Sequence, residues 1–266
     1  MAALRVVGKL SVLLVLLPVV VLHPLASTGS LQQSHPEMVG RPADELGDQF
    51  EGDMLLTEDQ KAELRKRTGM YLPTFLWPDR TVPYEIVTTD FNTDQRAAIE
   101  AAMRTIEQAT CVRFVPATST TVDFVRIAAG SGCSSFVGRI RGPQALHLLP
   151  SAVGTGCFLH GTIVHELIHA LGFYHMQSAT DRDLYVSIQW ANIAPGREEN
   201  FQSYGTDRIM SYGVAYDFNS IMHYDSRAFS VNGLPTIVPL VENVAIGQRV
   251  AMSSGDIQRI RNMYQC

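Results

Sequence analysis

A short segment of this chain places three histidines and one carboxylate at spacings that build a metal site. Residues 165–175 read His-Glu-Leu-Ile-His-Ala-Leu-Gly-Phe-Tyr-His. His165 and His169 are four residues apart, so their rings project from one face of an α-helix, about one turn apart. Gly172 allows the backbone to leave the helix at a positive φ, which turns the chain so that His175 can return as a third ligand. Glu166 lies beside these ligands.

This pattern is typical of a hydrolytic zinc site. Zinc in a hydrolase keeps three protein ligands and one open position for water, whose pKa it lowers toward neutrality. The three histidines therefore predict one Zn²⁺ per chain, and Glu166 is predicted to take the proton of that water as general base. A shorter His-Glu-x-x-His match arises by chance in amphipathic helices, but the added glycine and third histidine resemble the longer metzincin signature.

Further motifs resemble the astacin family of zinc metalloendopeptidases, within the metzincins. Residues 172–175 read Gly-Phe-Tyr-His, residues 181–183 read Asp-Arg-Asp, and residues 220–224 read Ser-Ile-Met-His-Tyr, as in the family's methionine turn. The resemblance implies that Met222 packs beneath the metal. It also implies that Tyr224 is a weak additional ligand that later hydrogen-bonds the tetrahedral intermediate. The alternative for Tyr224 is a packing role under the site.

The resemblance covers about residues 50–266 and implies an α+β fold. Such a two-lobe catalytic domain has a mixed sheet and the zinc helix in its upper lobe, and a mostly irregular lower lobe with a C-terminal helix. The hydrophobic spacing itself predicts both element types. Helices are expected over residues 93–108, 160–171 and 254–264, and strands over 82–87, 122–128, 136–140 and 145–149.

Two positions depart from the family pattern. Astacins usually carry Glu at the position of Met176, where it anchors the buried N-terminus of the mature enzyme, and often Arg at the position of Ala179. Met176 cannot accept a charged hydrogen bond, so the new N-terminus must be held through other groups or more loosely. The catalytic positions are unchanged.

The N-terminal quarter predicts a secreted protein made as a latent zymogen. Residues 1–27 contain basic residues, then an apolar run interrupted by proline, then small residues, which is the pattern of a signal peptide. The apolar run is shorter than a membrane-spanning helix requires and is interrupted by proline, so a membrane anchor is not expected. Residues 28–67 are polar and acidic and are expected to form a propeptide, and residues 68–266 the catalytic domain. An activating protease is expected to cut after Arg67, in the basic run of residues 65–67.

Within this propeptide, residues 50–53 read Phe-Glu-Gly-Asp, which resembles the astacin motif Phe-x-Gly-Asp. The resemblance implies that Asp53 occupies the position of the catalytic water on zinc in the zymogen. A carboxylate is a competent zinc ligand, so it would block water activation. The alternative is a Gly-Asp turn in a disordered tail.

Four cysteines follow the predicted signal peptide. An even count in a secreted chain predicts two disulfides, for which three connectivities exist. The family pattern implies Cys111–Cys266 and Cys133–Cys157.

The expected substrates are proteins or peptides that add as a strand to an exposed sheet edge, for which the resemblance implies residues 144–149. Residues 246–249 resemble a family segment whose arginine lines the pocket for the residue after the scissile bond. That arginine is Arg249 here, and it would favour Asp or Glu at that substrate position. The alternative is a surface arginine without this role.

A net charge of −5 without an extended basic cluster argues against nucleic acid as a partner. Ending at Cys266, the chain is expected to be a minimal, single-catalytic-domain form without a membrane anchor when mature.

Two rival functions remain. One is a catalytically silent zinc-binding or adhesion protein on the same fold. The presence of Glu166, Tyr224 and Asp53 argues against this alternative, because a silent protein needs neither a general base nor a latency switch. The other is zinc-dependent hydrolysis of a small ester or amide, which would not explain a propeptide.

Overall fold

The computed structural model describes residues 42–66, 75–205 and 211–266, with only the backbone of residues 63–66, and all of these belong to one compact unit spanning Glu37–Cys266. The predicted signal peptide and the predicted cleavage point after Arg67 lie outside the described residues. Within the described part of the chain, no helix is long and apolar enough to cross a membrane.

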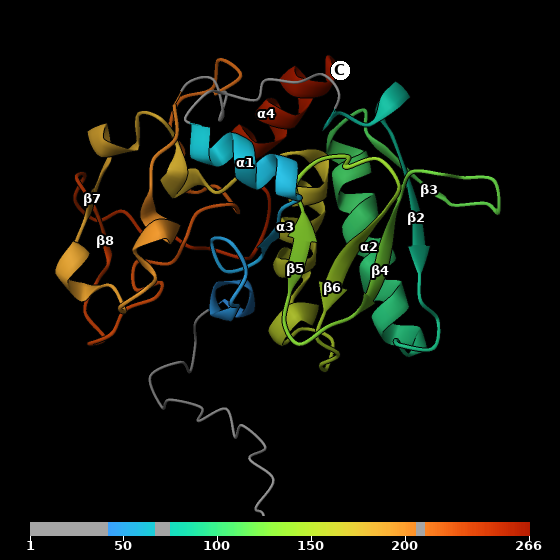
Figure 1. Cartoon of the computed structure of the whole chain (residues 1–266), viewed down its shortest axis with the longest axis horizontal. Coiled ribbons are helices and arrows are strands. Elements are labelled where there is room, and N and C mark those ends of the chain that lie inside the picture. Colours follow the sequence, from blue (N-terminus) through green and yellow to red (C-terminus); the bar gives the residue numbers. More distant parts are fainter. Residues whose placement is uncertain (1–41, 67–74, 206–210) are drawn as a thin grey trace, which may run out of the picture. The chain divides into compact units, whose positions relative to one another are not determined.

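A six-stranded mixed sheet organises the first half of the unit (Figure 1). Its spatial order is β1-β5-β6-β4-β2-β3, and β5 pairs antiparallel with β6 while the other neighbours are parallel. The strands are β1 Met54–Leu55, β2 Thr81–Ile86, β3 Arg113–Pro116, β4 Phe124–Ala129, β5 Ser134–Phe136 and β6 Pro143–Leu148. The sequence did not predict β1 or β3, and β5 begins before the expected run.

The position of β6 corrects the expected substrate-binding edge. β6 lies between β4 and β5 and is paired with both, so its hydrogen-bonding groups face two neighbours. The next strand toward that end of the sheet is β5, and β1 of the predicted propeptide pairs with it at the edge. A peptide cannot add to an interior strand, so the prediction for residues 144–149 is wrong, and β5 is the strand that removal of β1 would leave open.

Two helices, α2 Thr93–Ala109 and α3 His160–Leu171, pack together with the sheet around one hydrophobic core. Asn92 caps α2 through a reciprocal pair of hydrogen bonds with Gln95, so the predicted start is confirmed. The apolar face of α2 contributes Ile99, Met103 and Ile106 to the core. Helix α3 is buried along almost its whole length, which holds its side chains rigidly.

The second half contains more regular structure than expected. β7 Val186–Ile188 and β8 Ile237–Pro239 form an antiparallel pair, and this half has its own hydrophobic cluster around Phe201 and Tyr224. Helix α4 Ser254–Tyr264 has the bounds expected from the sequence, and the Ser253 side chain caps its start. The short 3₁₀ turns of the described chain are Ala43–Leu46, Pro78–Arg80, Gly156–Phe158, Met176–Ser178, Arg182–Leu184, Trp190–Asn192 and Glu198–Phe201. The two-lobe α+β class is confirmed, with β7 and β8 as an addition to the lower lobe.

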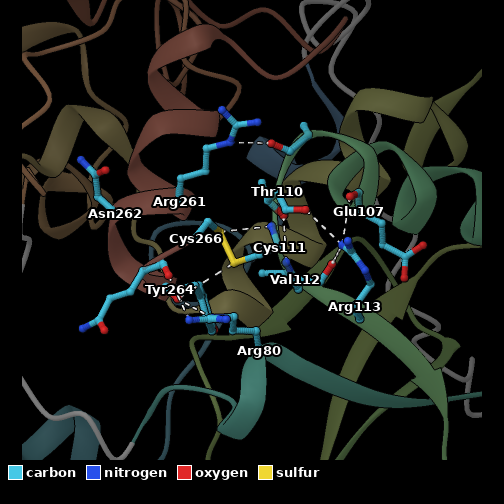
Figure 2. Close-up of a disulfide and its surroundings, with 12 residues drawn as sticks. Arg80, Glu107, Thr110, Cys111, Val112, Arg113, Arg261, Asn262, Tyr264 and Cys266 are labelled. Atoms are coloured by element: carbon cyan, nitrogen blue, oxygen red, sulfur yellow. Dashed lines mark hydrogen bonds between the residues drawn. A yellow bond between two sulfur atoms is a disulfide. The ribbon is translucent and has the colours of Figure 1, made fainter.

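The structure contains the disulfides Cys111–Cys266 and Cys133–Cys157, the pairing that the resemblance implies. Figure 2 shows the first of them, which joins the end of the chain to the segment after α2. Arg80 donates to the carbonyl oxygens of Tyr264 and Gln265 at 2.9 and 3.0 Å, beside this bridge. The C-terminal helix is thereby tied to the sheet half.

Helix α1 Glu58–Lys66 was not predicted, although its start was readable. Thr57 and Gln60 form a reciprocal capping box, with Thr57 N–H donating to Gln60 Oε1 at 2.9 Å and Gln60 N–H to Thr57 Oγ1 at 3.2 Å. The Thr-x-x-Gln spacing is the usual sequence signal of such a box. Gln60 also donates to Val137 O at 2.9 Å, so the predicted propeptide docks on the sheet half.

Candidate metal centre

Helix α3 positions the first two histidines and the glutamate between them. His165, Glu166 and His169 are all fully buried. The helix ends at Gly172, which adopts the left-handed conformation (φ 113°, ψ 16°) expected of it and donates its N–H to His169 O at 2.8 Å. The chain then turns back and brings His175, also fully buried, to the same place.

Asp53 of the predicted propeptide completes a cluster of four candidate ligands with these histidines. One ligand atom from each of Asp53, His165, His169 and His175 lies within 4.8 Å of the others. His165 Nε2 is 3.1 Å from His169 Nε2 and 3.3 Å from His175 Nε2, and it is 3.0 Å from Asp53 Oδ2. Four nitrogen and oxygen donors converging in this way suit a single tetrahedral metal ion.

The outer nitrogen of each imidazole is held by an acceptor. His165 Nδ1 lies 2.8 Å from Ile221 O, and His169 Nδ1 lies 2.7 Å from Phe173 O. His175 Nδ1 lies 2.9 Å from a Glu51 carboxylate oxygen. These partners keep the proton on Nδ1, so all three Nε2 lone pairs face the centre of the cluster, which is the arrangement of metal-ligating histidines. The residues therefore fit a metal ion.

The carboxylates at the centre are held in opposite charge states. Burial opposes ionisation of Asp53, but the nearby His175 and His169 rings outweigh it and hold the pKa of Asp53 well below its usual range. Burial, reinforced by the negative charges of Asp53 and Asp44, raises the pKa of Glu166 well above its usual range. Among the described residues, neither Glu166 oxygen has a hydrogen-bond partner. Asp53 is therefore the anionic member of the cluster, and burial favours the neutral form of Glu166.

The methionine turn contacts the metal ligand His165. Ile221 supplies the acceptor for His165, and Met222, 3% exposed, joins the main hydrophobic core. Asp256 at the start of α4 fixes this turn by accepting from Ser220 Oγ at 2.5 Å and from Ile221 N–H at 2.9 Å. The sequence marks Asp256 only as part of a helix start, because its contact is 35 residues away along the chain.

Tyr224 lies against the third ligand. Its ring centroid is 4.7 Å from that of His175, and the side chain is fully buried. Its hydroxyl donates to Glu51 O at 2.5 Å, so a residue of the predicted propeptide binds the phenol in this structure. Burial and the Glu51 carboxylate raise the pKa of Tyr224 well above its usual range, which keeps it a hydrogen-bond donor.

Comparison with known proteins decides the family. The family model described as Astacin, a peptidase family, matches residues 70–265. The chain belongs to the astacin family. The zinc metalloproteinase nas-15 of Caenorhabditis elegans is 42% identical over 191 residues, which are 72% of this chain and 32% of that protein. Seminal metalloprotease 1 of Drosophila melanogaster is 41% identical over 210 residues, which are 76% of this chain and 83% of that protein.

A solved structure agrees with this assignment. High choriolytic enzyme 1, a hatching enzyme zinc-protease from medaka fish (Oryzias latipes), is 39% identical with a TM-score of 0.65, covering 76% of this chain and 96% of that one. This chain covers only 32% to 46% of the length of three Caenorhabditis elegans relatives, nas-15, nas-13 and nas-14. The family is zinc-dependent, and the cluster of Asp53 and the three histidines can bind one zinc ion.

The two departures from the astacin pattern lie at one pocket. Met176 and Ala179 are buried and line a cavity of about 550 Å³, together with aromatic side chains and Arg259. Arg259 Nη2 lies 3.8 Å from Met176 Sδ and donates to Ala215 O at 2.6 Å. The sulfur thus contacts a guanidinium where family members usually have a carboxylate, while the metal ligands are untouched.

Arg249 is not a free surface arginine in this astacin. It is 5% exposed and donates to Asp44 Oδ2 at 3.0 and 2.6 Å, and to Glu45 Oε1 at 3.2 Å. The pKa of Glu45 is raised to about 8, chiefly by burial and despite Arg249. We did not predict Asp44, Glu45 or Glu51, since acidic residues in a polar tail carry no local signal of a partner.

Proposed function

We propose that the chain is a secreted zinc-dependent endopeptidase made as a latent zymogen. The observation that carries this proposal is the cluster in which Asp53 of the N-terminal segment meets three histidines beside an unpaired, buried Glu166. A hydrolase needs the histidines and the glutamate, whereas only a latent hydrolase needs the aspartate.

His165, His169 and His175 would hold zinc, which when bound polarises the attacking water and the scissile carbonyl. Glu166 is proposed to take the proton of that water and return it to the leaving amine once the negative charges of Asp53 and Asp44, which help to raise its pKa, have left with the propeptide. Tyr224, once released from Glu51 O, donates a hydrogen bond from its phenol to the oxyanion that develops on the carbonyl. Such a donor stabilises the transition state more than the ground state.

Latency follows from the position of Asp53. Its carboxylate occupies the space that water needs, and it is kept anionic by the surrounding imidazoles. We propose that residues 28–67 form the propeptide, that residues 1–27 direct secretion, and that cleavage after Arg67 frees the catalytic domain of residues 68–266. The basic run of residues 65–67 supports the cleavage site, since trypsin-like proteases cut after such residues.

The substrates are peptides that replace the propeptide in the cleft. β1 runs parallel to β5, and a substrate strand on the same edge can run antiparallel, which is the more stable pairing. Arg249 is proposed to bind an acidic side chain after the scissile bond. The support is that Arg249 already binds the carboxylate of Asp44 and the carboxyl group of Glu45, both in the proposed propeptide.

The test is cleavage of casein by the full chain after processing at residues 65–67 and loading with zinc. Glu166→Ala and a zinc-chelated sample serve as controls, and activity is expected to disappear in both. A processed, zinc-loaded chain that cleaves neither casein nor a broad peptide library would refute the endopeptidase and favour the silent zinc-binding protein.

A further inference from the structure

The Glu51 side chain occupies a second carboxylate site, separate from Arg249 and on the outer side of the metal ligand His175. It is fully buried. Oε2 lies 2.9 Å from His175 Nδ1, while Oε1 accepts from Ser178 Oγ at 2.9 Å and from Tyr204 OH at 2.6 Å. Three donors from three points of the catalytic domain thus converge on one carboxylate of the propeptide.

These donors select a carboxylate over a neutral amide. Because Nε2 of His175 faces the metal cluster, Nδ1 carries the proton and must donate. Ser178 and Tyr204 donate to the other oxygen, so both oxygens of the carboxylate accept hydrogen bonds. A glutamine side chain could accept from Nδ1 and turn its N–H₂ toward the two hydroxyl oxygens, but these hydrogen bonds would lack the charge that roughly doubles the strength of hydrogen bonds to a carboxylate.

The site is also close to the reaction centre. Nδ1 and Nε2 belong to the same His175 ring, so the carboxylate binds one imidazole width away from the metal cluster. Phe50 and Tyr204 stack at 6.4 Å between ring centroids, so the propeptide itself covers the site. Removal of the propeptide takes away both Glu51 and this cover, and it leaves the three donors facing the cleft.

We propose that His175 Nδ1, Ser178 and Tyr204 form a carboxylate-binding subsite that selects an acidic side chain of the substrate, in addition to the one read by Arg249. This inference rests on the proposed endopeptidase function and names its substrate class: peptides with two acidic residues around the scissile bond. The propeptide has this character, since Asp44 and Glu51 occupy the two sites at once.

The competing acceptor is a group of the catalytic domain itself. Gln177 is fully buried next to Ser178, and among the described residues both atoms of its side-chain amide are without a partner. If the Gln177 side chain turned to accept hydrogen bonds from Tyr204 and His175 after propeptide removal, no substrate carboxylate would be required. Only the proposed subsite makes peptide binding depend on an acidic side chain at this position.

The experiment compares peptides that carry Glu or Gln at each position around the scissile bond, with both termini blocked so that only the side chain changes. The zinc-loaded, processed full chain is used. We expect kcat/KM to favour Glu by about tenfold at two positions, since a hydrogen bond to a charged group is worth roughly that much. Tyr204→Phe and Ser178→Ala should lower the Glu-to-Gln ratio at one position only. Arg249→Lys should lower it at the other, because lysine lacks the paired donors of arginine.

The matched control is Tyr84→Phe in β2, which should keep both ratios. Binding of the same peptides to the Glu166→Gln variant, measured by fluorescence anisotropy, gives a readout that does not need turnover. If Glu and Gln peptides bind equally, or if Tyr204→Phe changes neither ratio, the subsite is refuted and Gln177 is the acceptor. A preference in binding without cleavage by the wild type would retain the subsite and refute the endopeptidase.

Discussion

The substitution Asp44→Asn in the unprocessed chain tests how the proposed propeptide is held. Asp44 Oδ2 accepts two hydrogen bonds from Arg249, and both side chains are buried. Near neutral pH, Glu45 is largely protonated because its pKa is raised to about 8. Asp44 therefore supplies the negative charge that pairs with the buried guanidinium.

Breaking a buried ion pair by removing one partner costs about 3–5 kcal/mol. The low end applies, because Glu45 Oε1 lies 3.2 Å from Arg249 Nη2 and can ionise once the charge of Asp44 is gone. The chain can avoid this cost by releasing the propeptide from the cleft without unfolding the core. About 3 kcal/mol then corresponds to a roughly 10²-fold larger population of the released state.

Hydrogen exchange at the Ser135 amide measures this release, because that N–H donates to Asp53 O at 2.9 Å across the boundary between propeptide and catalytic domain. Exchange in Asp44→Asn should be roughly 10²-fold faster than in the wild type, and peptide hydrolysis by the unprocessed chain should rise in parallel. The control is Asp48→Asn, which removes an exposed pair with Arg197 and should change exchange only a few-fold. Equal exchange in Asp44→Asn and Asp48→Asn would refute the assignment of Arg249 as the anchor.

Four further outcomes are expected. Burial raises the pKa of Glu45 from 4.5 to about 8, so between these pH values the docked propeptide holds a proton that the released propeptide loses. Docking should therefore weaken as the pH rises from 4.5 to about 8. The exchange rate of the Ser135 amide, corrected for the intrinsic effect of pH, should follow this change in the wild type and not in Glu45→Gln. Asp256→Ala leaves the methionine turn unsupported and should cost about 1–3 kcal/mol in urea unfolding. Replacing both Cys111 and Cys266 by alanine should cost about 2–5 kcal/mol, and more than the same change at the shorter bridge, since the bridged cysteines are 155 and 24 residues apart. Zinc removal should lower Tm by several degrees, and an unchanged Tm would contradict a structural contribution of the metal.

The family and the α+β class could be predicted from the sequence because they depend on local spacing. Residues four apart on a helix share a face wherever the helix lies, so His165 and His169 required no tertiary information. Gly172 likewise follows from a conformation that glycine adopts without steric cost. The ends of α2, α3 and α4 were readable from capping residues and apolar periodicity.

The strand predictions were weaker because pairing depends on partners that are distant in the sequence. β1 is a two-residue strand that exists only because β5 accepts it, and nothing in its composition marks it as extended. The substrate edge was assigned to β6 from its place just before the zinc helix. The order of strands in the sheet, which makes β6 interior, is a tertiary property.

The sequence by itself determined the metal-ligating segment, the candidate general base and the candidate latency motif, because helix geometry and ligand chemistry act over a few residues. Only the tertiary structure decided which carboxylate meets which cation or donor. Asp44 reaches Arg249 across 205 residues, and Glu51 reaches His175 across 124. An acidic residue in a polar segment looks the same whether it is solvated or buried against a guanidinium. The difference arises only when folding removes water from both groups, since an unpaired charge is costly in the interior and inexpensive at the surface.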